Sequence, residues 1–381
     1  MRIVYCLDSI NGVGGIQRVT LIKANALAAL PENEVWIIVA DNSGKRFSPL
    51  SSTIHFIDLG INYYQDDWKS RFHVLKGILF KRIIYKKRLA EALRKILPDI
   101  VIGVGQSEKF FLPQIKGRWS TVREFHFCKD YRRRVATDLF EKTVALFGDC
   151  LDWFILRRYD RIVVLTQEDL ETNWRGIKNV TVIPNPAWIK SEGVSSLDQK
   201  RVLAVGRLSS QKNFASLIRA YSIVAKRFPD WHLDILGEGE EREKLTRLIS
   251  NLALDEKVTL CGNTIDVQKE MLSSSIFALP SKFEGFAMVL LEAIGCGLPC
   301  VCYSCPCGPK DLFTDGVNGF LVPVGDEMLL AEKICYLIEN EAERRRMGHE
   351  ALMSSIRFDP SLIIQTWIAL FRELSTPVRK K

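Results

Sequence analysis

The sequence predicts an α/β protein of two domains, each built on a doubly wound parallel sheet. Three observations lead to this fold class. The chain has 381 residues, a length that fits two medium domains better than one. Short apolar runs alternate with stretches of helical periodicity, as the strands and helices of a parallel sheet do. The alternation starts afresh after residues 191–200, so the second half is expected to form a sheet of its own.

The first domain is expected to span residues 1–186 and begins with the short apolar strand Ile3–Leu7. A glycine turn at Asn11–Gly15 follows this strand, and helical periodicity then continues to Leu30. The apolar runs that we expect to form the further strands are Val35–Ala40, Ile54–Ile57, Ile100–Val104 and Arg161–Leu165.

A linker over residues 187–199 leads to a second domain, residues 200–360, which opens with the strand Arg201–Val205 and the loop Gly206–Asn213. Residues 361–381 are expected to form a C-terminal helix and a basic tail that pack back on the first domain. Two such domains would enclose a cleft, because parallel sheets bind ligands beyond the carboxyl ends of their strands. The remaining elements expected in the second domain are a helix over Phe214–Phe228, a strand over Trp231–Leu236, a helix over Glu241–Leu252, and strands over Val258–Leu260 and Ile276–Leu279.

The composition and the N-terminus point to a cytosolic protein with reduced cysteines. No uninterrupted apolar run reaches the ~20 residues of a spanning helix, and Asp8, Arg18 and Lys23 interrupt the place where a signal peptide would be apolar. Without export, the ten cysteines are expected to be thiols. The five near residue 300 lack the paired C-x2-C spacing of zinc sites, and we interpret them as core thiols. These five are Cys296, Cys300, Cys302, Cys305 and Cys307.

The net charge of +8 belongs to the first half of the chain. Residues 1–190 hold 30 Lys and Arg against 20 Asp and Glu, a net +10, whereas residues 191–381 hold 23 against 25, a net −2. An anionic partner of the first half is either nucleic acid or an anionic membrane. No nucleic-acid-binding module is recognisable in the sequence, so we expect no nucleic-acid partner.

The most basic segment is residues 69–95, with ten Lys and Arg and the single acid Glu91. Apolar residues recur in it at helical spacing, and a basic amphipathic helix of this kind is typical of proteins that attach to anionic lipid. A helix packed on the sheet with a solvated basic face explains the same pattern, and the sequence leaves both interpretations open. The apolar residues concerned are Phe72, Leu75, Leu79, Ile83, Leu89 and Leu93.

Two loops carry residues suited to phosphate. Gly14 and Gly15 follow the first strand, where the backbone can approach a ligand and a helix N-terminus favours an anion. Arg207 and Lys212 follow the strand Arg201–Val205, and a guanidinium and an ammonium five positions apart can converge on a diphosphate. Each feature taken alone also fits an ordinary glycine turn or a solvated loop cation.

The most specific pattern is Glu284-x7-Glu292. A strand ends near Pro280, and Met288–Ile294 is expected to form a helix whose first amides, around Phe286–Met288, face an anionic or sugar oxygen. Glu292, about one turn into the helix, can accept the hydroxyls of a ribose, and Glu284 can lie against a sugar. An N-cap acid with a solvated helical Glu would leave the apolar surroundings of Glu292 unexplained.

The segment SKFEGFAMVLLEAIGCGLPCVCYSCPCGPKDLFTDGVNGFLVPVGD (Ser281–Asp326) resembles the C-terminal signature of retaining glycosyltransferase family 4. The resemblance extends to the Gly14–Gly15 turn, to VIPNP at Val182–Pro186, to GRL…K at Gly206–Lys212 and to LGEGEEREKL at Leu236–Leu245, and so spans nearly the whole chain. It implies the GT-B fold, two facing Rossmann-like domains, as in bacterial enzymes of polysaccharide and lipopolysaccharide biosynthesis.

The resemblance also implies roles for single residues. Gly15, after Gly14, would contact the diphosphate or the donor sugar, and Arg207 and Lys212 would bind the diphosphate. Glu284 would contact donor-sugar hydroxyls and Glu292 the ribose, with Gly285, Phe286, Ala287 and Met288 completing the donor loop. His126 matches the family's active-site histidine, although a histidine between Phe125 and Phe127 also fits a core position. These are the site residues predicted for this chain.

The expected activity is retaining transfer of a sugar from a nucleotide-sugar, with UDP favoured, to a glycan or lipid-linked glycan. Two cations and helix N-termini can stabilise the leaving diphosphate, and the cleft loops hold no Asp-x-Asp, so we expect neither a metal nor a cofactor. A sugar-nucleotide epimerase of the same fold and a non-catalytic glycan- or nucleotide-binding protein stay open as alternatives.

Overall fold

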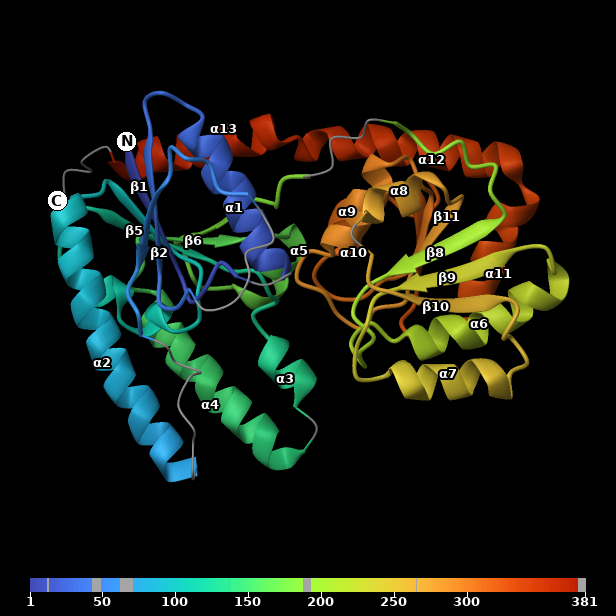
Figure 1. Ribbon diagram of the computed structural model, residues 1–381, viewed down its shortest axis with the longest axis horizontal. Coiled ribbons are helices and arrows are strands. Elements are labelled where there is room, and N and C mark those ends of the chain that lie inside the picture. The colour runs from blue at the N-terminus through green and yellow to red at the C-terminus, as the bar shows by residue number, and fades with distance from the viewer. Residues whose placement is uncertain are drawn as a thin grey trace. The chain divides into compact units, whose positions relative to one another are not determined.

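The protein folds into two compact units, each with its own parallel sheet (Figure 1). The computed structural model describes residues 1–11, 14–42, 49–61, 71–136, 138–187, 193–264 and 266–375, with the backbone alone over 71–79. The first unit comprises Met1–Leu165, Asp169–Pro186 and Pro360–Lys381, and the second comprises Thr166–Glu168 and Ala187–Asp359. Two parallel-sheet α/β units were the predicted fold class, which is confirmed.

The first unit contains a seven-stranded sheet in the order β3-β2-β1-β4-β5-β6-β7, with every pair of neighbours parallel. Its strands are β1 (Arg2–Leu7), β2 (Glu34–Val39), β3 (His55–Asp58), β4 (Ile100–Gly103), β5 (Ser120–Glu124), β6 (Arg161–Val164) and β7 (Val180–Val182). Its helices are α1 (Gly15–Ala28), α2 (Arg71–Ile96), η1 (Glu108–Phe110), η2 (Leu112–Gln114), α3 (Tyr131–Val135), α4 (Leu139–Leu156), α5 (Gln167–Asn173, whose first two residues belong to the second unit) and α13 (Pro360–Ser375).

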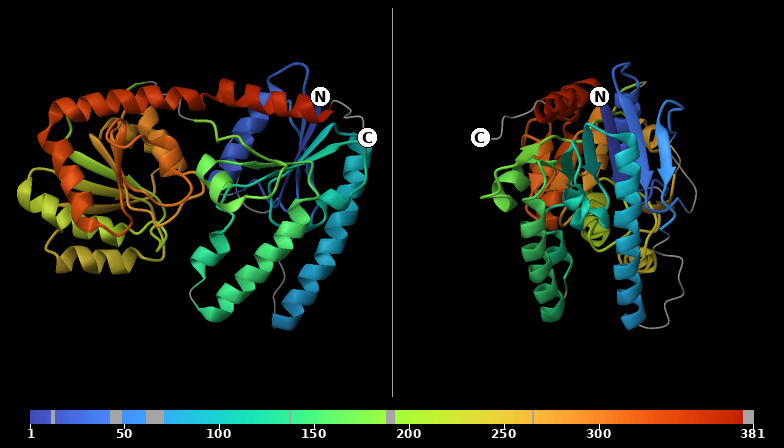
Figure 2. Two further views of the ribbon diagram at one scale, coloured as in Figure 1. Left: turned by 180° about the vertical axis from the view of Figure 1, so that it is seen from behind. Right: turned by 90° about the vertical axis from the view of Figure 1, so that its left-hand side faces the viewer.

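Alternate residues of the first sheet point into two different apolar layers, because side chains alternate between the faces of a strand. On one face Ile3 and Tyr5 pack with α1 and with α13, whose Trp367 is fully buried. On the other face Val4 and Cys6 pack with α2 and with the segment that follows η1. Figure 2 shows α13 lying beside α1, so the last helix of the chain completes the core of the first unit.

The second unit contains a six-stranded parallel sheet in the order β10-β9-β8-β11-β12-β13. Val202 and Ala204 of β8 pack against α6, which lies beside α11 in the same core. The strands are β8 (Arg201–Val205), β9 (His232–Leu236), β10 (Val258–Gly262), β11 (Ile276–Leu279), β12 (Cys300–Tyr303) and β13 (Gly319–Val322). The helices are α6 (Phe214–Arg227), α7 (Arg242–Asn251), α8 (Val267–Leu272), α9 (Met288–Gly295), α10 (Pro309–Leu312), α11 (Glu327–Glu339), α12 (Glu341–Ser355) and η3 (Ile356–Phe358).

The predicted elements are confirmed with ends that shift by one or two residues, apart from strands β8 and β11, whose predicted ends are unchanged. The sequence did not predict strands β5, β7, β12 and β13 or helix α4. The cysteines Cys296, Cys300, Cys302 and Cys305 are buried thiols in and around β12, as interpreted. No helix in the described ranges is long and apolar enough to cross a bilayer.

Within the basic segment 69–95, residues 71–95 belong to α2, which confirms the predicted helix over the described part. Leu89 and Leu93 are buried in the core of the first unit, whereas Ile83 is 69% exposed. The C-terminal half of α2 therefore packs on the sheet and leaves its cations in solvent. Lys69 and the side chains of residues 71–79, which include Phe72, Leu75 and Leu79, lie outside the described part of the chain.

Candidate functional site

Strand order in the second unit brings two of the predicted site residues into contact. Strands β8 and β11 are neighbours, so the loops that follow them, residues 206–213 and 280–287, lie at the same edge of the sheet. Lys212 from the first loop donates to Glu284 from the second, with Nζ 2.7 Å from Oε1. Their side chains are 17% and 7% exposed, so the edge holds a cation and a carboxylate that are largely shielded from solvent.

Backbone hydrogen bonds fix the same two loops. The amide of Lys282 donates to the carbonyl of Gln211 at 2.9 Å, and the Gln211 side chain donates back to the carbonyl of Phe283 at 3.0 Å. The amide of Glu284 donates to the carbonyl of Pro306 at 3.1 Å. Because the backbone around both side chains is held in this way, the positions of Lys212 and Glu284 do not depend on their own contact alone.

The loop 280–287 leads directly into α9, which begins at Met288 as predicted. Ala287 precedes the helix in the left-handed conformation (φ 55°, ψ 56°), which residues other than glycine seldom adopt. In the described structure no side chain caps this helix N-terminus, so its first amides keep their capacity to bind an anion. The side chain of Phe286, a residue of this loop, is buried, and Glu292 in α9 is half-buried. Gly308 approaches the loop, since a Cβ on it would lie 3.3 Å from the carbonyl carbon of Phe286.

Arg207 differs from Lys212 in its surroundings. Its side chain is 75% exposed and pairs at 3.3 Å with Glu240 of the loop after β9. The backbone beside it is held firmly, because the amide of Leu208 donates to Glu238 at 2.9 Å and Leu208 accepts from Glu241 at 3.0 Å. An exposed guanidinium on a fixed backbone is free to turn toward an anionic ligand.

In the first unit, Gly14 and Gly15 form the start of α1. Gly14 is the N-cap residue and Gly15 the first residue of the helix, and no side chain of the described residues caps it. A Cβ on Gly15 would meet no atom within 4 Å, so the space on the side-chain side of its Cα is open. Gly12 and Val13, which complete the predicted turn, lie outside the described residues.

His126 follows β5 and lies in a buried charged cluster of the first unit. Its side chain is 4% exposed, and its Nε2 lies 3.4 Å from Oε1 of Glu124. The same carboxylate pairs with Lys23 of α1, and both of these groups are almost fully buried. Burial, together with the charges of Lys23 and Arg123, lowers the pKa of His126 well below its ordinary value. The imidazole is therefore neutral near pH 7.

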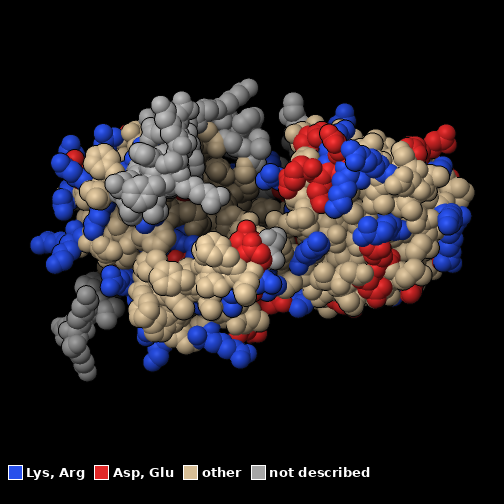
Figure 3. Space-filling model, turned by 90° about the horizontal axis from the view of Figure 1, so that it is seen from below, with Lys and Arg blue, Asp and Glu red and all other residues tan. Residues whose placement is uncertain are grey.

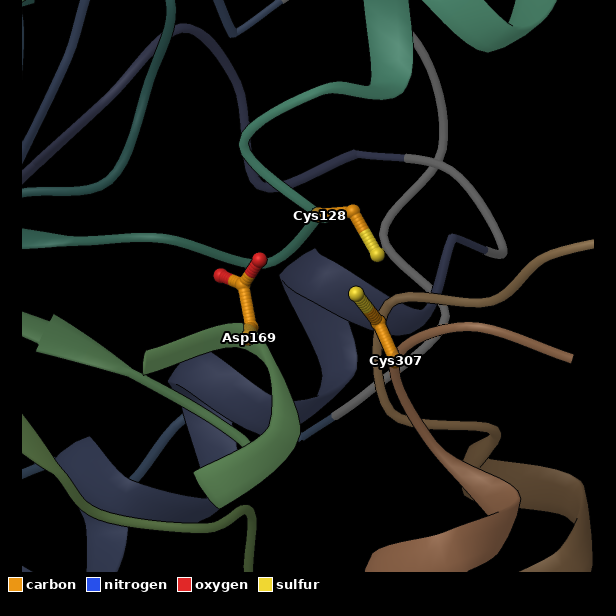
Figure 4. A group of neighbouring side chains, drawn as sticks. All are labelled: Cys128, Asp169 and Cys307. Carbon is orange, nitrogen blue, oxygen red and sulfur yellow. The ribbon is translucent and has the colours of Figure 1, made fainter. Parts of the chain in front are cut away.

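The segment after His126 is fastened to α5. Figure 4 shows Cys128 on this segment and the Asp169 carboxylate on α5. The amide of Lys129 donates to Asp169 at 3.4 Å, and Asp169 also accepts from the Trp174 indole at 2.7 Å. Cys307, the third residue drawn, belongs to the second unit, where its amide donates to Glu168 at 2.8 Å. The anchoring through Asp169 limits how far the backbone around His126 can move.

Comparison with known proteins finds a family match for one part of the chain. Residues 188–352 match the family model of glycosyl transferases group 1. This part of the chain is a glycosyl transferases group 1 domain, and the protein is a glycosyltransferase.

The enzyme resembles other glycosyltransferases over most of its length. It is 28% identical to the amylovoran biosynthesis glycosyltransferase AmsD of Erwinia amylovora over 377 residues, 96% of this chain and 98% of that protein. A second relative is the N-acetylgalactosamine-N,N'-diacetylbacillosaminyl-diphospho-undecaprenol 4-alpha-N-acetylgalactosaminyltransferase of Campylobacter jejuni, 35% identical over 198 residues, 50% of this chain and 53% of that protein. The structure of Anabaena HepE in complex with UDP aligns with a TM-score of 0.72 at 17% identity, covering 98% of this chain and 100% of that one. Such structural likeness confirms the predicted GT-B fold.

Several residues around the candidate site were not found from the sequence. Gln211 joins the two loops through its hydrogen bond to Phe283, and Glu240 forms an ion pair with Arg207. The Cys305 thiol interacts electrostatically with Glu284 and Lys212. Burial, and then the charge of Glu284, raises the pKa of Cys305. These residues lie at the same edge of the second sheet because of the order of its strands. The spacing of the residues in the sequence does not indicate that order.

Gly237, in the loop after β9, offers a test of how closely this loop packs against the loop after β8. A Cβ on Gly237 would lie 2.0 Å from the carbonyl oxygen of Gly206, and its φ of 137° is unfavourable for other residues. Gly237→Ala is therefore expected to destabilise the enzyme by about 1–3 kcal/mol, measured by urea denaturation. Gly295→Ala is the matched control, because its Cβ would meet nothing within 4 Å. Equal stability of the two variants would contradict the packing described.

Proposed function

We propose that the enzyme transfers a sugar from a UDP-sugar to a glycan or lipid-linked glycan, with retention at the anomeric carbon and without a metal ion. The observation that carries this proposal is the shielded Lys212–Glu284 pair beside the N-terminus of α9. A cation and open helix amides suit a diphosphate, and the neighbouring carboxylate suits sugar hydroxyls.

The chemistry follows from where charge develops. Breaking the bond between sugar and phosphate places negative charge on the leaving diphosphate, and groups already fixed around that position stabilise it. Lys212, Arg207 and the first amides of α9 are the groups proposed to do so. Glu284 is proposed to hold the donor sugar and Glu292 the ribose. Metal independence is proposed because the loops that follow the strands hold no Asp-x-Asp.

For the first unit we propose contacts made by Gly15 and His126. Gly15 begins α1, whose N-terminus has no side-chain cap among the described residues, and such a terminus suits an approaching phosphate or sugar oxygen. A neutral, buried His126 can donate or accept one hydrogen bond to a sugar hydroxyl. Its Nε2 lies 3.4 Å from Oε1 of Glu124 and makes no hydrogen bond within the described residues.

The named relatives support the choice of substrates. HepE of Anabaena has been solved with UDP, which favours a UDP donor here. AmsD takes part in amylovoran biosynthesis, and the Campylobacter enzyme is named for a diphospho-undecaprenol substrate. From these relatives we propose that the acceptor is a precursor of a cell-surface polysaccharide or lipopolysaccharide. We also propose that the enzyme acts in the cytosol, at the inner face of the membrane.

A nucleotide screen tests the donor class directly. UDP at 100 times its Kd is expected to add about 2.7 kcal/mol of stability by linkage, seen as a rise in Tm, with smaller rises for GDP and ADP. A larger shift with GDP or ADP would refute the UDP assignment. Incubating the preferred nucleotide-sugar without an acceptor gives the control, since free epimerised nucleotide-sugar would indicate an epimerase instead.

A further inference from the structure

Helix α4 of the first unit exposes its apolar residues to solvent. Leu139, Phe140 and Phe147 are 81%, 77% and 74% exposed, and Phe154 is 63% exposed. At 3.6 residues per turn, the large exposed side chains of α4 fall together on one half of the helix. Single exposed apolar residues are ordinary, but a contiguous apolar face marks an interaction surface. The remaining members of this face are Val144, Leu146, Leu151 and Trp153.

Ion pairs fix which side of α4 faces outward. Asp152, on the opposite side, is buried and pairs at 2.9 Å with both Lys109 and Arg132. Asp149 pairs at 2.7 Å with Arg133. Turning the apolar half inward would expose or break these contacts, so the orientation of the helix is a property of the fold. Asp138 also caps the helix by accepting from the amide of Glu141 at 2.7 Å.

Positive charge is carried by α2, the other long helix that projects from the first sheet. Helices α2 and α4 both project from the sheet in the same direction (Figures 1 and 2). Over residues 80–96, α2 carries seven Lys and Arg against the single acid Glu91. Figure 3, seen from the side toward which α2 and α4 project, shows uncharged surface bordered by Lys and Arg and by some Asp and Glu. Arg157, at the C-terminal end of α4, stacks 4.3 Å over the Trp153 ring.

We propose that α4 is a membrane-docking helix, whose apolar half enters the headgroup region of an anionic lipid surface while α2 supplies the attracting charge. An apolar helix face with cations beside it is the form that interfacial helices take. A second copy of the chain fits less well, because pairing two α4 faces would bring the strongly basic α2 helices of both copies together. The proposal depends on α4 and α2 and not on the proposed donor site.

Vesicle binding tests the proposal. The full-length enzyme is expected to sediment with phosphatidylcholine vesicles that contain phosphatidylglycerol, and far less with phosphatidylcholine alone. The double variant Phe147→Gln/Phe154→Gln is expected to bind about tenfold or more weakly, because two apolar side chains no longer enter the lipid. Met328→Gln/Met353→Gln, which changes two exposed apolar residues of the second unit, should bind as the unaltered enzyme does.

Three results would overturn the proposal: no binding of the enzyme at low salt, equal binding of the Phe147/Phe154 variant, or a dimer in sedimentation velocity that this variant dissolves. The UDP thermal shift of every variant is measured in parallel without vesicles. A normal shift in a variant that has lost vesicle binding shows that it is folded, and a failure of the nucleotide screen leaves the vesicle result standing.

An exposed cysteine on α4 gives an independent measurement. Cys150 is exposed on this helix, and Cys261 is exposed in the second unit. A dye that brightens in apolar surroundings, attached to Cys150 in a Cys261→Ser background, is expected to brighten on addition of anionic vesicles. The same dye at Cys261, in a Cys150→Ser background, should not respond. Equal responses at the two positions would contradict docking through α4.

Discussion

Lys212→Ala is expected to lower kcat for sugar transfer by about 10²–10³-fold, the usual effect of removing one fixed group that stabilises charge in a transition state. The substitution removes the ammonium that lies 2.7 Å from Glu284 and leaves that carboxylate, 7% exposed, without this partner. Glu284→Gln should cause a comparable loss while keeping the shape of the side chain. Initial rates with the donor found in the nucleotide screen provide the measurement.

Lys244→Ala is the matched control for this loss. Lys244 pairs with Glu241 at 3.1 Å on α7 and is 71% exposed, so its removal changes one lysine without touching the loops 206–213 and 280–287. Turnover by Lys244→Ala should equal that of the unaltered enzyme. Near-normal turnover by both Lys212→Ala and Glu284→Gln, in proteins with an unaltered Tm, would show that the reaction takes place elsewhere.

Removing one member of the Lys23–Glu124 pair is expected to destabilise the protein by about 3–5 kcal/mol, the typical cost of leaving one buried charge without its partner. The two side chains are 1% and 0% exposed, and Lys23 also lies 4.9 Å from the centre of the Trp367 ring. Burial lowers the pKa of Lys23, so the site is unfavourable for an unpaired ammonium. Lys23→Met is the variant of choice because it keeps the length of the side chain.

Urea denaturation measures this effect. Lys200→Met serves as the control, since Lys200 pairs with Asp230 on the surface, where the two side chains are 60% and 53% exposed and such pairs contribute about 1 kcal/mol at most. The double variant Lys23→Met/Glu124→Gln should recover part of the loss, because no uncompensated charge then stays buried. A Lys23→Met protein as stable as Lys200→Met would contradict the buried pair.

Elements with a plain apolar pattern were predictable from the sequence, and those that depend on distant partners were not. Strands β8 and β11 are short apolar runs with clear boundaries, and their predicted ends agree with the structure. Strand β5 (Ser120–Glu124) was missed because its buried Arg123 and Glu124 break the apolar pattern. Arg123 pairs with Glu108 at 3.2 Å and Glu124 pairs with Lys23, so the partners that permit burial lie far away in the chain.

The candidate site was predictable to a similar degree. The sequence placed Lys212 and Glu284 in loops after separate strands, because the apolar runs that precede them are clear. It did not indicate that β8 and β11 are neighbours, so it did not indicate the contact between the two side chains or the bridging role of Gln211. Helix α4 was missed for a different reason, which concerns exposure and not strand order. Its apolar residues are exposed rather than buried, and a sequence pattern alone does not show which side of a helix faces solvent.

Helix α13 has a consequence for the order in which the protein folds during its synthesis. Ribosomes deliver a chain from its N-terminus, and domains generally fold as they emerge. Residues 360–375 are made after the whole second unit, yet Trp367 and Phe371 are fully buried in the core of the first unit. Until α13 has been synthesised, the apolar face of the first sheet that this helix covers stays exposed to solvent. An exposed apolar face of this kind binds chaperones and promotes aggregation. The unit that is synthesised first is the one that finishes folding last.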